Sequence, residues 1–155
     1  MQLKWMLSHT RGYLELGMVD AAAAELERVP KEHANNFEVR VLQALIFQER
    51  KDWTALTPLA AGLTRDQPQD AGWWIMWAYA TRRADSLAAA EKILLEAESN
   101  HPTDAMIKFN LGCYACQLGD LPRAQAYVDK AIALDERFRE AAAKDSDLEP
   151  LRLNQ

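Results

Sequence analysis

Cysteine and long apolar runs are both scarce in this chain. Of its 155 residues only Cys113 and Cys116 are cysteines, which is too few for a disulfide framework and suits a reducing compartment. No apolar run approaches the roughly 18 residues that a membrane span needs, and the first residues enter an amphipathic helix without a signal-peptide core. We therefore expect a cytoplasmic protein that does not cross a membrane.

The chain also has no excess of basic residues and no segment with the composition of a flexible linker. The chain has 18 basic and 23 acidic residues, for a formal net charge of -5. Nucleic acids and anionic membrane surfaces are bound by basic patches, so we expect neither as the main partner. Six glycines and six prolines are spread along the sequence and leave no linker or low-complexity block. The length and the 49% hydrophobic content favour one domain, residues 1–155, with a continuous core.

Catalytic motifs are a third absence. The sequence has no phosphate-binding glycine loop, paired-carboxylate motif or metal-ligand spacing, and the spacing of His9, His33 and His101 supports no triad with a cysteine nucleophile. Cys113-x-x-Cys116 lies inside a helical pattern, not at a helix N-terminus, and no second pair completes a zinc site. A redox or metal role is the less favoured alternative to two small side chains on a helix face. We predict a non-enzymatic chain with no cofactor and no metal.

The chain does contain a helical hairpin pattern from Ala105 to Asp135. Gly112 lies in the middle of a helical stretch, where glycine costs about 1 kcal/mol relative to alanine, so we expect a second helix to approach it closely. Gly119 and Asp120 end one helix and cap the next, and Pro122 falls in the first turn of the second helix. The stretch predicts two helices that pack through small residues.

The same pattern recurs every 34 residues. Numbering each repeat from its first residue gives four starting points, at Leu3, Phe37, Ala71 and Ala105. Position 8, where the helices cross, is Thr10, Ala44, Ala78 and Gly112. Its partner, position 20, is Ala22, Leu56, Ala90 and Ala124. A shared register of this kind predicts a stack of four helix hairpins.

The repeat resembles the tetratricopeptide repeat. The family pattern W-x-x-L-G-x-x-Y, then A-x-x-x-F, then P is best matched in the third repeat, by Trp74, Trp77, Ala78, Ala90, Leu94 and Pro102. The fourth repeat has Leu111, Gly112, Ala124 and Val128, but Lys108 where an aromatic residue is usual. The resemblance implies an all-α fold, a right-handed superhelical stack of four hairpins over residues 3–36, 37–70, 71–104 and 105–136, followed by a C-terminal capping helix within 137–152.

Several local expectations accompany this register. Trp74 and Trp77 should be core residues, and Asp70, with Thr103 or Asp104, should cap the helices that follow them. Pro58 should cause a local irregularity in the helix from about residue 53 to 64. Beyond residue 136, Ser146 and Glu149 have capping-box spacing.

In this family the first helices of the repeats line a concave groove that binds peptides. The resemblance implies that positions 2, 5, 9, 12 and 13 face the groove. Our candidate binding residues are Arg11, Val41, Leu45, Ile75, Tyr79, Arg82, Arg83, Phe109 and Cys113. An apolar strip beside a basic pair predicts a partner segment with apolar anchors and an acid that faces Arg82 or Arg83. The alternative is that the C-terminal helix folds back and covers these residues.

Three roles follow from the resemblance. The chain is expected to be an adaptor that binds a protein or peptide segment, as a monomer or weak homodimer. One alternative is an accessory protein that binds a filament subunit, as do the bacterial kinesin-light-chain-like proteins that accompany bacterial tubulins, and another is a type III secretion chaperone. Co-chaperones of this family that hold the acidic tails of heat-shock chaperones use Lys at position 5 and Asn at position 9. This chain has Leu7 and Arg11 there, so that clamp is absent.

Overall fold

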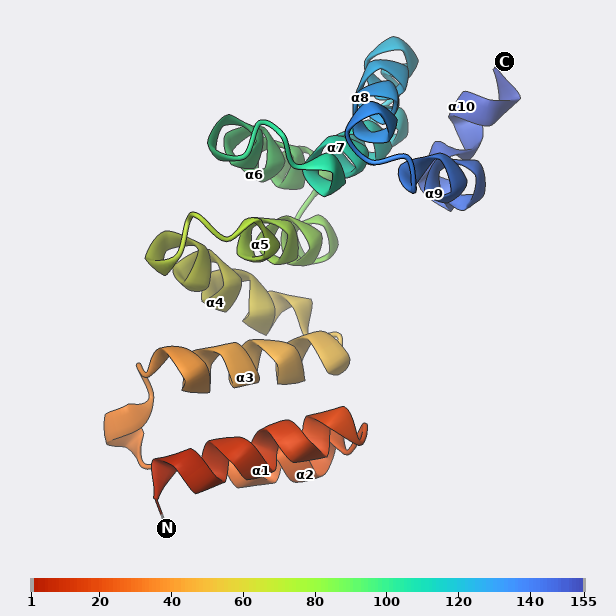
Figure 1. The fold of residues 1–155 in the computed structure, drawn as a ribbon. Coiled ribbons are helices and arrows are strands. Elements are labelled where there is room, and N and C mark those ends of the chain that lie inside the picture. The colour runs from red at the N-terminus through yellow and green to blue at the C-terminus, as the bar shows by residue number, and fades with distance from the viewer. Residues whose placement is uncertain (1, 155) are drawn as a thin grey trace. The chain divides into compact units, whose positions relative to one another are not determined.

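The computed structural model describes residues 2–154, and the regular elements within that range are all helices. In chain order they are α1 (Leu3–Glu15), α2 (Val19–Glu27), η1 (Lys31–His33), α3 (Phe37–Glu49), α4 (Trp53–Asp66), α5 (Ala71–Ala84), α6 (Leu87–Asn100), α7 (Ala105–Gln117), α8 (Leu121–Leu134), α9 (Phe138–Lys144), η2 (Ser146–Leu148) and α10 (Glu149–Leu153) (Figure 1). The predicted all-α class is confirmed.

The first helix of each hairpin begins at the start of its predicted repeat. These helices, α1, α3, α5 and α7, begin at Leu3, Phe37, Ala71 and Ala105. Each packs against the helix that follows it, so the chain forms four successive helix pairs. Apolar residues at helical spacing produce this arrangement because each helix has one face to bury.

Position 8 of the four pairs has no residue larger than Thr, and position 20 is Ala in three of them and Leu56 in the second. Positions 8 and 20 are buried in all four pairs. At Gly112, an added Cβ would lie 3.0 Å from Cγ2 of Val128 and 3.3 Å from the carbonyl oxygen of Ala124. Both neighbours belong to α8, so the close approach of a second helix does explain this glycine.

Short polar side chains cap the helices of the second half of the chain. The carboxylate of Asp70 accepts a hydrogen bond from the Gly72 N–H, and that of Asp104 accepts one from the Ile107 N–H, both at 2.9 Å. Ser86 caps α6 and Asp120 caps α8 in the same way. These caps satisfy N–H groups that have no partner inside the helix.

Three of the four hairpin turns use the left-handed backbone region. Gly17 has a φ of 72° and Gly119 a φ of 89°, as suits glycine. Lys51 holds the equivalent place after α3 with a φ of 56°, which a residue with a Cβ adopts at a cost. In the third turn, Asp85 has a φ of -129° and needs no such strain.

The chain divides into two compact units, which we describe separately. The N-terminal unit, Met1–Asp66, contains α1 to α4. Its buried cluster joins α1, α2 and α3 through Leu7, Ala22, Ala23, Leu26, Val39, Leu42 and Ile46. The sequence-based division into one domain with four repeats and a cap remains a prediction.

The C-terminal unit, Gln67–Gln155, contains α5 to α10. Its core runs through α5, α6, α7 and α8 and includes Leu148 and Leu151 near the C-terminus. Trp74 is buried, and its indole Nε1 donates to the Pro68 carbonyl at 2.8 Å. Trp77 is only half-buried against the same core, so the expected core position is met in full by Trp74 and in part by Trp77.

Three local expectations need correction or completion. α4 runs from Trp53 to Asp66 with Pro58 inside it, so the proline does not end the helix, and a local bend there remains a prediction. Near the C-terminus, Asp145 and not Ser146 is the capping side chain, because its Oδ1 accepts from the Asp147 N–H at 2.9 Å. Lys108, where an aromatic residue is usual in the family, places its ammonium 2.7 Å from the Glu98 carboxylate.

The last three helices, α9, η2 and α10, form what we call the C-terminal segment. η2 packs on α7, while α9 and α10 pack on α8. Leu148 and Leu151 carry its buried apolar contacts, so the predicted terminal capping helix is present. None of the helices between residues 2 and 154 has the length and apolar character needed to span a membrane.

Candidate functional site

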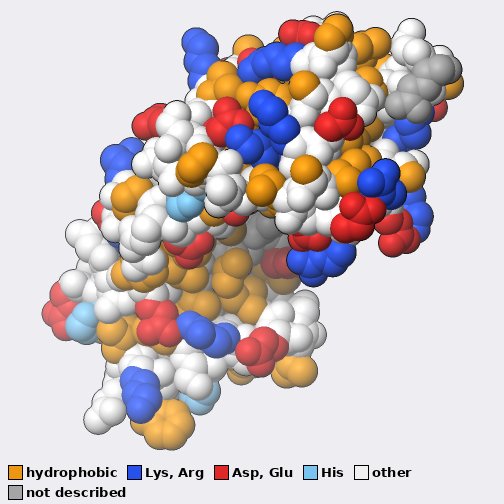
Figure 2. Space-filling view, turned by 45° about the horizontal axis from the view of Figure 1, so that its top comes forward, with side chains coloured by type: hydrophobic (Ala, Val, Ile, Leu, Met, Phe, Trp, Pro, Cys, Tyr) orange, Lys and Arg blue, Asp and Glu red, His pale blue; other side chains and the backbone are white. Residues whose placement is uncertain are grey.

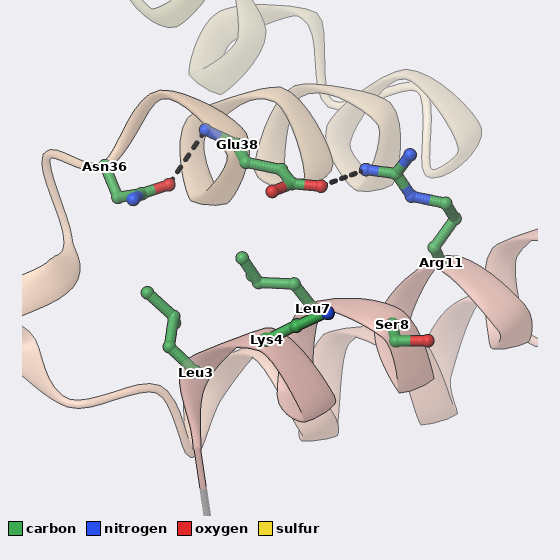
Figure 3. A pocket seen from close by; sticks show the side chains of 7 residues that line it. All are labelled: Leu3, Lys4, Leu7, Ser8, Arg11, Asn36 and Glu38. Carbon is green, nitrogen blue, oxygen red and sulfur yellow. Dashed lines mark hydrogen bonds and ion pairs between the residues drawn. The ribbon is translucent and has the colours of Figure 1, made fainter.

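Two adjoining pockets lie between α1 and α3 in the N-terminal unit. The first has a volume of about 470 Å³ and is lined by Leu3, Lys4, Leu7, Ser8, Arg11, Asn36 and Glu38. Figure 3 shows Leu3 and Leu7 projecting from α1 into the space below α3. The second has a volume of about 370 Å³ and is lined by Arg11, Leu14, Glu15, Val41, Leu42, Leu45 and Glu49. We call the two pockets together the N-terminal groove.

An ion pair lies where the two pockets meet. The guanidinium of Arg11 is 2.5 Å from a carboxylate oxygen of Glu38, and each side chain is 52% exposed (Figure 3). Asn36 accepts a hydrogen bond from the Glu38 N–H and so fixes the start of α3 next to this pair. Arg11 lines both pockets, so the middle of the groove contains one guanidinium whose charge is balanced by the Glu38 carboxylate.

Apolar side chains and two carboxylates line the second pocket. Leu14, Val41, Leu42 and Leu45 form its apolar wall. Glu15 is the last residue of α1 and Glu49 is the last residue of α3, and both are exposed at the pocket edge. The arrangement offers apolar contact area beside negative charge.

Three of the predicted groove residues therefore line the N-terminal groove. Arg11, Val41 and Leu45 come together there. Their place in the pocket does not test whether they bind a partner, so their role remains a prediction.

In the C-terminal unit the chain itself covers the equivalent helix face. Phe109 is 5% exposed because Phe138 of α9 packs on it, with ring centroids 5.0 Å apart. Cys113 is 3% exposed. The expectation that Phe109 belongs to an exposed strip is wrong, and the alternative, that the C-terminal segment covers this face, is correct for α7.

Arg82 is held by an acid from the same chain. Its guanidinium donates to both carboxylate oxygens of Asp147, at 2.6 and 2.9 Å, and this hydrogen bonding raises the pKa of Arg82. The amide of Gln117 donates to the Asp147 carbonyl at 2.8 Å. The acid that we expected a partner to place opposite Arg82 is thus supplied by the C-terminal segment.

The remaining predicted residues of this unit stay nearer the surface. Tyr79 is 40% exposed, with the Arg83 guanidinium 3.6 Å from its ring centroid. Ile75 is half-buried against the core. The guanidinium of Arg83 thus stacks on the aromatic ring of Tyr79. A role of these residues in partner binding remains a prediction.

One cluster contains side chains of the types that bind metals, but its carboxylates already have hydrogen-bond partners within the chain. A thiol and two carboxylates, from Cys113, Asp145 and Asp147, lie within 4.8 Å of one another. Asp147 is engaged by Arg82, and Asp145 caps η2. Burial raises the pKa of the Cys113 thiol, which keeps it protonated and opposes both metal ligation and nucleophilic reactivity. Asp147 instead holds the C-terminal segment to α5 and α7, through Arg82 and Gln117.

The charges on one face of the molecule are mixed. On the face drawn in Figure 2, acidic and basic side chains lie among one another and among apolar ones. This face does not have the single-sign basic patch that nucleic-acid binding requires.

Comparisons with known proteins show a common fold. No family model matches the chain, and no curated protein matches it. Among solved structures, TTC0263, described as a thermophilic TPR protein in Thermus thermophilus, is 23% identical with a TM-score of 0.68, covering 97% of this chain and 81% of that chain. MamA from Desulfovibrio magneticus is 17% identical with a TM-score of 0.76, covering 91% and 76%. Another MamA structure is 16% identical with a TM-score of 0.78, covering 97% and 84%. At these identities the likeness is one of fold.

Proposed function

Because the chain has the fold of the tetratricopeptide-repeat proteins, we propose that it is a protein-interaction module that binds a segment of a partner protein in the N-terminal groove. The single observation that carries this proposal is the pocket formed by Leu14, Val41, Leu42 and Leu45. An apolar pocket rimmed by charged side chains is typical of a surface that receives an apolar anchor from a partner.

The contrast between the two units supports this choice of groove. In the C-terminal unit, Arg82 of α5 and Phe109 of α7 already contact the C-terminal segment. In the N-terminal unit, the corresponding face of α1 and α3 forms the N-terminal groove. We therefore assign partner binding to the N-terminal unit.

The other parts of the proposal concern where and how the chain acts. We propose a cytoplasmic, non-enzymatic adaptor, since both cysteines are buried free thiols, which suits a reducing compartment. The filament-accessory and secretion-chaperone roles remain alternatives that no observation on residues 2–154 favours over an adaptor. The monomer or weak homodimer expected from the sequence likewise remains a prediction.

The test is affinity capture from an extract of the native host with three versions of the chain. Val41→Asp places a charge in the apolar wall of the groove, and Ala24→Asp places the same charge on an exposed face of α2 as the matched control. We expect wild type and Ala24→Asp to retain the same partner and Val41→Asp to lose it. Equal recovery with all three, at equal helix content by circular dichroism, would overturn the assignment to this groove.

A further inference from the structure

We propose that the N-terminal groove selects partner segments that carry a basic residue next to an aliphatic anchor. This inference rests on the proposed function and specifies the chemistry of the partner. It begins from the two carboxylates at the pocket edge, Glu15 and Glu49.

Glu15 and Glu49 occupy the same place in successive repeats. Each is residue 13 counted from its repeat start, at Leu3 and Phe37, and each ends the first helix of its pair. Their side chains line one pocket together with the aliphatic wall. Two carboxylates at the C-terminal ends of helices add to the partial negative charge of those ends, so this edge of the pocket attracts a cation.

The basic residues of the groove do not neutralise this edge. Arg11 already pairs with Glu38. Lys4 lies eleven residues before Glu15 on the same helix, which is about 16 Å at the helical rise of about 1.5 Å per residue. The groove therefore has an anionic end next to its aliphatic pocket.

The C-terminal unit shows how the same repeat positions bind a segment of opposite charge. There, positions 12 and 13 include Arg82 and Gln117, and both hold Asp147 of the C-terminal segment. In the N-terminal unit, position 13 is acidic in both repeats. A segment that uses the same mode of binding needs a cation where the C-terminal segment has Asp147.

The expected occupant is thus a protein segment with a Leu, Ile or Val anchor for the pocket and a Lys or Arg that reaches Glu15 and Glu49. The aliphatic contact supplies most of the affinity, and the exposed ion pairs supply selectivity, since each is worth only about 0.2 to 1 kcal/mol. Segments with an acid at that place are disfavoured by like charge.

The test uses a displayed library of random short peptides, selected on the full chain and on two variants. Glu15→Lys/Glu49→Lys reverses the edge charge at helix ends where cations are tolerated, and Val41→Asp disables the pocket. For wild type we expect enriched peptides with an aliphatic residue at a fixed spacing from Lys or Arg. The charge-reversed variant should bind those peptides about tenfold more weakly and enrich Asp or Glu instead.

The outcomes separate this inference from the proposed function. Enriched peptides that share an aliphatic anchor without a basic residue, and that are lost with Val41→Asp, would overturn the charge selectivity and leave the groove in place. No enrichment by wild type, or peptides that Val41→Asp still binds, would overturn the proposed function as well. Weaker binding of the selected peptides at higher salt, with no such effect on versions whose Lys is replaced by Ala, would further support the ion pairs.

Discussion

At the scale of single residues, two helical glycines have opposite surroundings. An added Cβ on Gly112 would meet Val128 and Ala124 of α8 at 3.0 and 3.3 Å. An added Cβ on Gly12, in α1, would have no such neighbour within 4 Å. Only the first glycine is required by packing, and the second only weakens its helix.

We predict that Gly12→Ala and Gly112→Ala differ in stability. Gly12→Ala should raise the free energy of unfolding by about 1 kcal/mol through helix propensity. Gly112→Ala gains the same propensity, but crowding against α8 costs about 1 to 3 kcal/mol, so it should be neutral or destabilised. Urea unfolding of both variants against wild type measures the difference. Equal gains would mean that α8 can move away from α7 without cost.

A second residue-scale prediction concerns Lys51, which adopts a φ of 56° where the other left-handed turns have glycine. Lys51→Gly should stabilise the chain by about 1 kcal/mol, because glycine removes the strain of the left-handed conformation. Lys51→Ala keeps a Cβ at that conformation and serves as the control, with no expected gain. Thermal unfolding of the two variants provides the comparison, and a gain for alanine equal to that for glycine would contradict the explanation.

At the scale of elements, the C-terminal segment and α7 depend on each other. Asp147 joins the segment to α5 through Arg82 and to α7 through Gln117, and Phe138 of α9 packs on Phe109 of α7. The side chains of the Arg82–Asp147 ion pair are each only 25% exposed. Loss of this pair should therefore lower the stability of the chain more than loss of a surface ion pair.

We predict that Asp147→Ala exposes the thiol of Cys113. In a Cys116→Ala background, Cys113 should react slowly with a thiol reagent, because it is buried and burial raises its pKa. Removing the Asp147 carboxylate should raise the labelling rate about tenfold, as expected for loss of a charged hydrogen-bond pair. Lys144→Ala breaks only the exposed pair with Glu140 and should leave the rate unchanged. Equal rates for the two variants would show that the segment does not protect the thiol.

The elements themselves were predictable where local signals define them. The 34-residue register placed the starts of α1, α3, α5 and α7, since small residues, turn glycines and capping residues recur at fixed offsets. The helix around Pro58 was also foreseen, since a proline in or just beyond the first turn need not end a helix. The covering of Phe109 was foreseen only as an alternative, since the end of a repeat stack needs a cap. The Arg82–Asp147 pair was not predictable, because partners 65 residues apart leave no local signal.

At the scale of the whole molecule, the two units have cores of different extent. In the N-terminal unit one buried cluster joins α1, α2 and α3, and α4 adds further buried residues, Leu56, Ala60, Ala61 and Leu63. In the C-terminal unit it runs from α5 to α8 and takes in η2 and α10. Because local stability follows the extent of buried apolar contact, the two units should not open with equal ease.

We predict that amide hydrogens of α7 and α8 exchange more slowly than those of α1 to α3. Hydrogen exchange read by mass spectrometry on the whole chain tests this directly. Asp147→Ala should speed exchange in the C-terminal segment and leave α1 to α3 unchanged, which provides an internal control. Uniform protection along the chain would mean that the units open together.

The C-terminal segment also makes this chain suitable as a sensor. It ends in α10 at Leu153, whose side chain is 77% exposed, while Asp147 is fixed on α7 and α5. A fluorescent dye attached at residue 153 should therefore report opening of the segment, as expected for Asp147→Ala, through a change in emission.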